Sequence, residues 1–262
     1  EYCARISYKS QDRITDDSYE KFVNMLVKRD HARPLEFGTV HLQMYISDFH
    51  KLRDTLCINN MWNDQWIKYH YAGNITYVTT NYRYYLAIIK VFPSAENDFD
   101  PQDDELYPKR YTVHFITSRG IMDEFRTHVG LSHLAESSRY CSYDKNRFGN
   151  ELTFIIPNWV NTNCPNKEQE GPSVASIEWS NAMSKAEDSY MNLIKMGCTA
   201  QEAREVLPLS IKSELISCGF EDVWSNFFYR RCAKDAHPMA REIATKVRDE
   251  FNKLKNETKE SK

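Results

Sequence analysis

The chain combines two kinds of hydrophobic pattern, which predicts a mixture of helices and strands. At 39–46 apolar and polar residues alternate, with Ile46 as the last inward residue, and this period of two is typical of a half-buried strand. At 19–29 the apolar residues instead return every three or four positions. We therefore predict a helix there that follows the capping residue Ser18 and turns Val27 inward.

The same two patterns continue through the rest of the chain. We predict further strands at 74–80, 111–117 and 210–217, further helices at 81–91, 121–128, 173–196, 221–232 and 238–254, and polar loops at 94–109 and 158–172. Gly197 follows the longest of these helices as a C-terminal cap. Thr199 and Glu202 have the spacing of a capping box, which predicts one more short helix before Pro208.

Strands and helices follow each other without the regular repeat of a doubly wound sheet. This order predicts an α+β fold in which a mixed sheet packs with helices. A length of 262 residues suffices for one large hydrophobic core. We therefore predict a single domain over 1–262, with a charged C-terminal tail at about 255–262 that frays.

Composition narrows the class of protein. Apolar residues make up 41% and charged residues 27% of the chain, as in soluble globular proteins, and a net charge of −3 gives no reason to expect a nucleic-acid binder. No apolar run approaches the ~18 residues of a membrane span. The seven cysteines are odd in number and include no C-x-x-C pair. They favour reduced thiols in the cytoplasm over a disulfide framework or a structural metal site.

The segment 126–140 holds the densest group of polar side chains that suit chemistry. It contains two arginines, two histidines, four serines or threonines and a carboxylate. Arg139 follows Ser137 by two residues, so a guanidinium and a hydroxyl can hold one anion together. The alternative is structural, with a helix-capping serine and a salt-bridged arginine. His128 and His133 are five residues apart, off the spacing of a zinc pair on one helical face.

Two arginines outside this segment change the balance between those alternatives. Arg204 lies in a short helix and Arg231 near the end of a longer one, and each alone is typical of a solvated or dipole-stabilising position. Together with Arg139 they favour a pocket for a phosphorylated small molecule. No glycine-rich phosphate loop occurs in the chain, so side chains would have to hold the nucleotide.

At these residues the sequence resembles the flavin-dependent thymidylate synthases, the ThyX family. The resemblance extends over most of the chain and is carried by segments 3–10, 34–37, 118–143, 148–157, 202–208 and 227–233. The family signature is Arg-His-Arg, seven residues, Ser, and then Arg-Tyr. Here His128, Ser137 and Arg139 keep their places, but Thr127 and Val129 replace both signature arginines.

Two further positions depart from the family. Phe37 stands where the family has a histidine beside the flavin, and Ala135 stands where a polar residue helps bind substrate. The altered positions are therefore mainly on the flavin side, and the resemblance supports the nucleotide site more strongly than the flavin site.

The resemblance implies a role for each motif residue. It implies catalytic roles for Ser137 and Arg139, substrate binding by Glu124, Ser137, Arg139, Arg204 and Arg231, and cofactor binding by Arg126, His128, Asn226 and His237. It also implies reductive methylation of dUMP to dTMP with methylenetetrahydrofolate, FAD and NADPH, in a homotetramer whose sites lie at subunit interfaces. Two alternatives stay open: an enzyme for another uracil nucleotide, and a non-catalytic nucleotide-binding homologue that has lost flavin.

Overall fold

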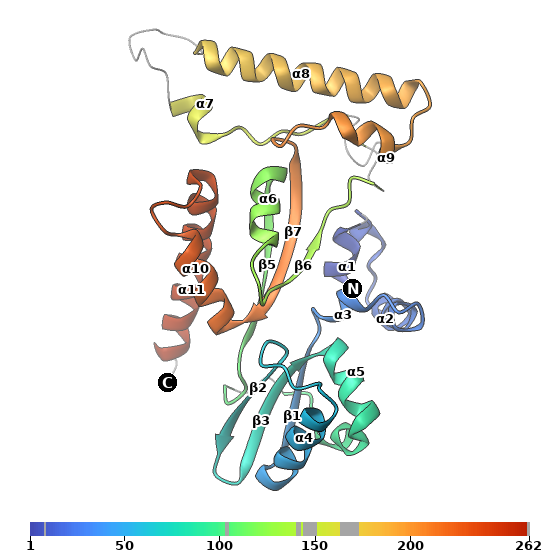
Figure 1. The fold of residues 1–262 in the computed structure, drawn as a ribbon, viewed down its shortest axis with the longest axis vertical. Helices are drawn as coiled ribbons and strands as arrows, with labels where there is room; N and C mark the ends of the chain where they lie inside the picture. Colours follow the sequence, from blue (N-terminus) through green and yellow to red (C-terminus); the bar gives the residue numbers. More distant parts are fainter. Residues whose placement is uncertain (8, 103–104, 140–142, 144–150, 163–172, 261–262) are drawn as a thin grey trace.

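Antiparallel sheets packed with helices form the protein, which confirms the predicted α+β class. The structure is a computed structural model that describes residues 1–7, 9–102, 105–139, 143, 151–162 and 173–260. The predicted sheet is divided into two, and the two sheets lie one beyond the other along the long axis (Figure 1).

The first sheet has the strand order β2-β3-β1-β4. Its strands are β1 (Thr39–Tyr45), β2 (Ile67–Ala72), β3 (Ile75–Asn81) and β4 (Phe99–Asp100), and the helices packed with it are α4 (Ile46–Ile58), α5 (Tyr82–Val91) and the 3-10 helix η2 (Pro93–Asp98). The alternation in β1 buries Leu42 and Met44 against Phe49, which lies on α4. Burial of this apolar face is what holds α4 and α5 on the sheet.

The second sheet has the order β5-β7-β6 and carries most of the predicted site. Its strands are β5 (Arg110–Ser118), β6 (Ser132–Ala135) and β7 (Lys212–Phe220), and its helices are α6 (Arg119–Arg126), α10 (Glu221–Arg231) and α11 (Pro238–Glu260). Trp224 and Phe227 of α10 pack with Phe125 of α6 and Phe115 of β5 in one aromatic core. This core fixes α6 and α10 relative to the sheet.

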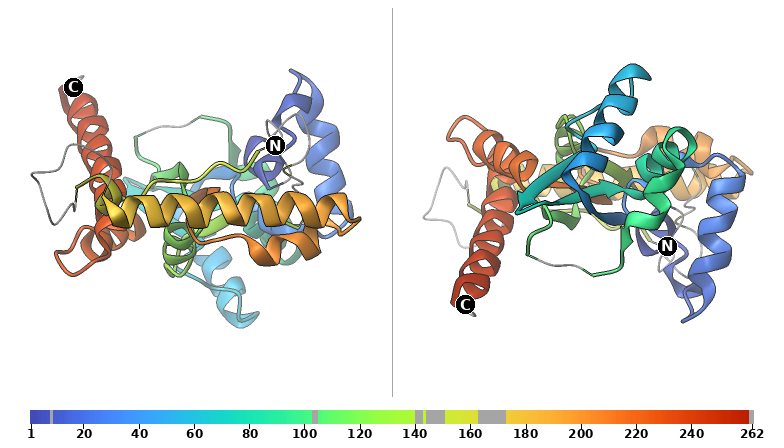
Figure 2. Two further views of the ribbon diagram at one scale, coloured as in Figure 1. Left: turned by 90° about the horizontal axis from the view of Figure 1, so that it is seen from above. Right: turned by 90° about the horizontal axis from the view of Figure 1, so that it is seen from below.

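The remaining elements lie at the ends and the side of the second sheet. They are α1 (Tyr2–Ile6), η1 (Gln11–Arg13), α2 (Ser18–Lys28), α3 (Ala32–Leu35), α7 (Asn158–Thr162), α8 (Val174–Lys195), α9 (Ala200–Ala203) and η4 (Arg204–Val206). Helix α8 extends across the molecule beyond the end of that sheet and packs on α9 and η4 (Figures 1 and 2).

A buried carboxylate connects the two sheets. Glu36, directly after α3, accepts a 2.7 Å hydrogen bond from Ser132 of β6 and pairs with Arg83 of α5. Its carbonyl oxygen accepts a 2.7 Å bond from Arg110 of β5. Because Arg83 lies on a helix packed with the first sheet, while Ser132 and Arg110 lie in the second sheet, Glu36 connects the two halves of the molecule.

Several predicted boundaries were wrong. Ile46 begins α4 because the chain turns at Tyr45, and Val27 is 40% exposed because α2 packs mainly through Leu26. The helix predicted at 121–128 begins two residues earlier, because Arg119 and Gly120 belong to the first turn of α6. Short elements lie within both predicted loops: η2 and β4 in 94–109, and α7 in 158–172, of which residues 163–172 lie outside the described ranges.

Part of the predicted charged tail is helical. Helix α11 continues through 255–260 to Glu260, and Lys255 pairs with Glu221 at the start of α10. This last part of the helix extends from a face that is packed on α10. Residues 261–262 lie outside the described part.

Candidate functional site

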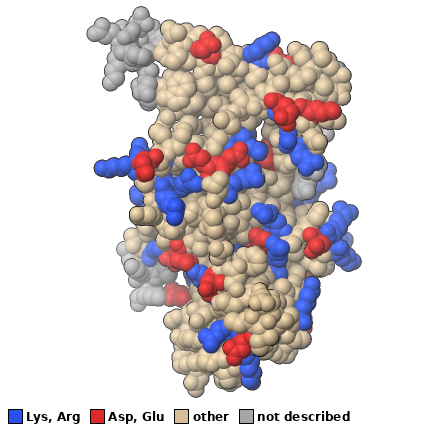
Figure 3. Space-filling model, viewed as in Figure 1, with Lys and Arg blue, Asp and Glu red and all other residues tan. Residues whose placement is uncertain are grey.

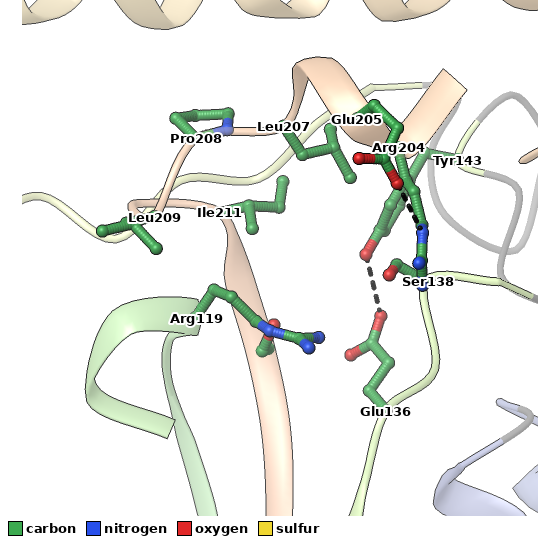
Figure 4. A pocket seen from close by; sticks show the side chains of 11 residues that line it. Arg119, Glu136, Ser138, Tyr143, Arg204, Glu205, Leu207, Pro208, Leu209 and Ile211 are labelled. Atoms are coloured by element: carbon green, nitrogen blue, oxygen red, sulfur yellow. Dashed lines mark hydrogen bonds and ion pairs between the residues drawn. The ribbon is translucent and has the colours of Figure 1, made fainter. Parts of the chain in front are cut away.

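A cavity of about 200 Å³ lies at the end of the second sheet, beneath α9 (Figure 4). Its walls are formed by Arg119, Glu136, Ser138, Tyr143, Arg204, Glu205, Leu207, Pro208, Leu209, Ile211 and Ser213. These residues come from the start of α6, the chain after β6, the segment from η4 to β7, and β7 itself. Three separate parts of the sequence, at 119, 136–143 and 204–213, therefore meet at one cavity.

Two arginines present their guanidinium groups at this cavity. Arg119 is tied by its Nε to Asp123 (3.1 Å), and Arg204 by its Nε to Glu205 (3.3 Å). Backbone bonds fix the start of α6 here, since Arg119 N–H donates to the carbonyl of Ile211 (2.9 Å). In each arginine the terminal nitrogens have no hydrogen bond to another described residue, an arrangement that suits phosphate recognition.

The predicted capping box holds the helix that precedes Arg204. The Thr199 hydroxyl accepts from the N–H of Glu202, and the Glu202 carboxylate accepts from the N–H of Thr199 (2.8 Å). Gln201 of this helix accepts a 2.9 Å bond from Arg139 Nε. The structure therefore brings Arg139 and Arg204, 65 positions apart in sequence, to the same short helix.

Only one of the two donor groups of Ser137, its hydroxyl, can meet a ligand. Its N–H donates to the carbonyl of Ser7 (3.2 Å), so the hydroxyl is the group left to meet a ligand. The next residue, Ser138, lines the cavity beside Arg204 (Figure 4). The signature residue Tyr140 lies outside the described ranges.

A buried group of charges lies next to the cavity on β7. Glu214 accepts bonds from Lys212 (2.9 Å) and Lys9, and its other oxygen is 3.1 Å from His114 Nε2. Burial alone would raise the pKa of Glu214, but hydrogen bonds from His114, Lys212 and Lys9 hold it well below its usual range. Glu214 is therefore ionised at neutral pH.

The second buried carboxylate, Glu136, belongs to the cavity itself. It is 4% exposed, and Tyr143 donates to its Oε1 at 3.2 Å (Figure 4). Burial raises the pKa of Glu136, Glu214 adds to that rise, and Lys9, 3.5 Å from Oε2, opposes it. Within the described part of the chain, Oε2 has no hydrogen-bond partner.

Arg231 lies elsewhere, on the other flank of the second sheet. Its guanidinium donates to the carbonyl of Glu124 (2.6 Å), to the Thr127 hydroxyl (3.0 Å) and to the Glu124 carboxylate (3.4 Å). Helix α10, which carries Arg231, packs on β7 and α11, whereas Arg204 follows α9 beneath α8. Within one chain the three arginines do not converge: Arg139 and Arg204 form one group, and Arg231 with Glu124 forms another (Figure 1).

The two histidines of the signature segment are both buried. His133 is a core residue, with Nδ1 2.9 Å from the Ser217 hydroxyl and Nε2 3.2 Å from the His128 carbonyl, and burial lowers its pKa to about 4. His128 packs edge-on against Phe227, and burial lowers its pKa, assisted by the charges of Arg231 and Arg230. Its Nε2 is buried with no hydrogen-bond partner among the described residues.

The other three predicted cofactor residues are exposed and already bonded. Arg126 pairs with Asp123 at 3.2 Å, and Asn226 accepts from Arg230 at 3.1 Å. His237 accepts from the Met239 N–H at 3.3 Å, which makes it a cap at the start of α11. None of these bonds prevents ligand contact, because each lies at the surface.

The two altered family positions have apolar surroundings. Phe37 lines a separate cavity of about 290 Å³ together with Cys3 and Tyr82, and Ala135 packs on the core of the second sheet. Burial raises the pKa of the Cys3 thiol. Neither position offers a polar group to a ligand.

Of the charged residues that line the cavity, sequence reasoning selected only Arg204 and missed Arg119, Glu136 and Glu205. Arg119 lies just before the helix predicted from residue 121, and Asp123 four positions on gives the local hint of an oriented guanidinium. Glu136 was visible as the carboxylate of the polar segment, but its direction depends on where β6 ends at Ala135. No group of metal-binding side chains is found among the described residues, and the five cysteines described are all free. No helix in the described part is long and apolar enough to span a membrane.

The family is established by comparison with family models. The model described as thymidylate synthase complementing protein matches residues 109–255, more than half of the chain. The protein therefore belongs to this family, the ThyX family. A search of curated proteins found no match.

Proposed function

We propose that the protein is a flavin-dependent thymidylate synthase that converts dUMP to dTMP in the cytoplasm. The observation that carries the proposal is the meeting of Arg139 and Arg204 at one helix beside a cavity. Family membership supplies the coarser class, a thymidylate synthase acting on a uracil nucleotide.

The residues of this chain would act by orientation and electrostatics. Arg139, Arg204 and the Ser137 hydroxyl would hold the phosphate and orient the ring. Carbon-5 of uracil is a poor nucleophile, so donors that stabilise charge developing on the ring would promote its attack on the one-carbon unit of methylenetetrahydrofolate.

Arg231 and Glu124 would complete the site from a neighbouring subunit. They lie on the other flank of the second sheet in one chain, so a shared interface would bring them to the nucleotide. We therefore propose a homotetramer. Helix α8 supports it, because Val174 (83% exposed) and Ile177 present apolar side chains at an end of the molecule with few charges in Figure 3.

The flavin would be held by Arg126, His128, Asn226 and His237. Cations lie close to this group: Arg126 belongs to it, and the charges of Arg231 and Arg230 help to lower the pKa of His128, whose buried Nε2 lacks a partner among the described residues. When bound, reduced FAD would supply the hydride for the reductive methylation, and NADPH would restore it.

One observation favours a second candidate, a nucleotide-binding homologue without flavin. Thr127 uses its hydroxyl to bond the Glu124 carbonyl (2.7 Å) and to accept from Arg231. Val129, at the other lost arginine, is 76% exposed and carries no charge. The flavin side therefore has fewer cations than the family signature provides.

Visible absorption spectroscopy separates the two candidates. The purified protein is measured before and after FAD and dUMP are added and unbound ligand is removed. The proposed function predicts a bound-flavin spectrum and dTMP formation when NADPH and methylenetetrahydrofolate follow. Calorimetric dUMP binding with no flavin under either condition would instead establish the binding homologue.

A further inference from the structure

The N-terminal segment contacts the signature segment at two consecutive residues. Helix α1 packs beside β6 (Figure 1), and after it the carbonyl of Ser7 accepts a 3.2 Å hydrogen bond from the N–H of Ser137. Two residues further on, the Lys9 ammonium lies 3.5 Å from Oε2 of Glu136 and donates to Glu214. This short segment therefore holds both the backbone and a side chain of the chain that follows β6.

Glu136 depends on Lys9 more than Glu214 does. Both carboxylates are buried, and the Glu136 N–H donates to the Glu214 carbonyl (2.8 Å), so the two residues are neighbours. Glu214 also contacts Lys212 and His114, whereas Lys9 forms the only ion pair of Glu136 within the described part of the chain. A buried carboxylate that loses its cation is strongly destabilised. Without Lys9, Glu136 would therefore take up a proton or turn away from its place.

The backbone of Lys9 is in the left-handed region, with φ +49°. Glycine adopts this conformation without the steric cost that a side chain brings. A glycine at position 9 would therefore keep the turn and remove the ammonium. Substitution can thus separate the contribution of the turn from that of the charge.

We propose that Lys9 is a positioning residue of the nucleotide site, which acts by holding the Glu136 carboxylate in place at the cavity wall. Ser137 and Arg139 follow Glu136 within three residues, so a shift of Glu136 displaces the donors expected to hold the nucleotide. Lys9 is not among the described residues that line the cavity, so it acts through Glu136 rather than on the nucleotide. The inference rests on the proposed function, because it takes dUMP as the ligand.

Substitutions of Lys9 test the proposal by calorimetric titration of the full-length protein with dUMP. Lys9→Met should weaken dUMP binding about tenfold, because Glu136 is left buried without its cation. Lys9→Gly should weaken binding by a similar factor, although the backbone of the turn is relieved. Lys9→Arg should stay within about threefold of the wild type, because it keeps a cation next to the carboxylate.

Removal of both charges shows whether Lys9 acts through Glu136. In Glu136→Gln no carboxylate remains for Lys9 to hold at this position, so the addition of Lys9→Met should change dUMP affinity by less than about threefold. The double variant leaves no unpaired carboxylate at position 136. It therefore decides the question even if Lys9→Met alone fails to fold.

Lys212→Met is the matched control. Lys212 bonds Glu214 as Lys9 does, at 2.9 Å, but it forms no ion pair with Glu136 in the described structure. This variant should lose thermal stability and keep its dUMP affinity.

Three results would overturn the inference and leave the proposed function intact. They are unchanged dUMP affinity in Lys9→Met or Lys9→Gly, a full tenfold loss when Lys9→Met is added to Glu136→Gln, and an equal loss of affinity in Lys212→Met. Absence of dUMP binding by the wild-type protein would overturn both the inference and the proposed function.

Discussion

His133 is a buried base whose protonation couples folding to pH. Its two ring nitrogens contact Ser217 and the His128 carbonyl, and its pKa falls from 6.5 to about 4. As the pH falls below 6.5, the imidazole of His133 therefore becomes protonated in the unfolded chain while it stays neutral in the folded protein. Stability from the neutral ring is present above that pH and is lost progressively down to about pH 4.

We predict that His133→Gln removes this part of the acid sensitivity. The wild-type protein should lose about 3 kcal/mol more of its free energy of unfolding between pH 7 and pH 4 than the variant, given a shift of this size. Urea unfolding across that range measures both proteins. Parallel curves for the two would contradict a neutral buried His133. His50→Gln, at an exposed position, is the matched control and should follow the wild type.

Arg139 is predicted to contribute directly to nucleotide affinity. Its guanidinium is at the surface and bonded to Gln201, so its loss leaves no buried charge behind. Arg139→Ala should weaken dUMP binding by about 10- to 100-fold, the scale of hydrogen bonds to a charged group. Calorimetry checks this, with Arg248→Ala as the control because Arg248 pairs with Asp249 on α11. Unchanged dUMP affinity would remove Arg139 from the site.

At the scale of single elements, the capping box of α9 has a role beyond helix stability. A four-residue helix depends on its ends, and α9 carries Gln201 and leads directly into Arg204. Thr199→Ala should cost about 1 kcal/mol of stability. It should also weaken dUMP binding several-fold, because both arginines of this group are positioned from α9.

Ser173→Ala is the matched control for that prediction. Ser173 caps α8 in the same way, by accepting from the N–H of Ser176, but no residue of α8 lines the cavity. This variant should lose similar stability in a thermal melt and keep its dUMP affinity. If Thr199→Ala also keeps its affinity, α9 does not need its cap to present the arginines.

The elements with a clear period were predictable, and those defined by their partners were not. β1 alternates, and α8 ends at the expected glycine, where Gly197 has φ +93°. β6 has four residues and is a strand because it pairs with β7. α4 was missed because the alternation of β1 continues into Ile46. β7 is buried along almost its whole length, and no pattern shows that Glu214 there meets two lysines.

At the scale of the molecule, the sequence indicated which arginines matter but not how they group. Arg139 and Arg204 meet because α9 folds back beneath α8, a long-range arrangement that periodicity cannot report. Arg231 instead caps the end of α6 through Glu124 and Thr127. One chain thus presents two incomplete sets of the predicted binding residues, which is the pattern expected when a site is assembled from two copies.

Mixing two inactive variants tests this arrangement. Arg139→Ala and Arg231→Ala should each abolish most dUMP-dependent synthase activity, because each removes one half of a shared site. If subunits are unfolded and refolded together at equal amounts, about a quarter of the sites combine an intact Arg139 from one subunit with an intact Arg231 from its neighbour. Activity should recover to that fraction of the wild type. Mixing without subunit exchange is the control and should give none. If the refolded oligomers contain both variants but are no more active than each variant alone, both arginines belong to the site of one chain. Arg231 would then have to leave Glu124 to reach the nucleotide.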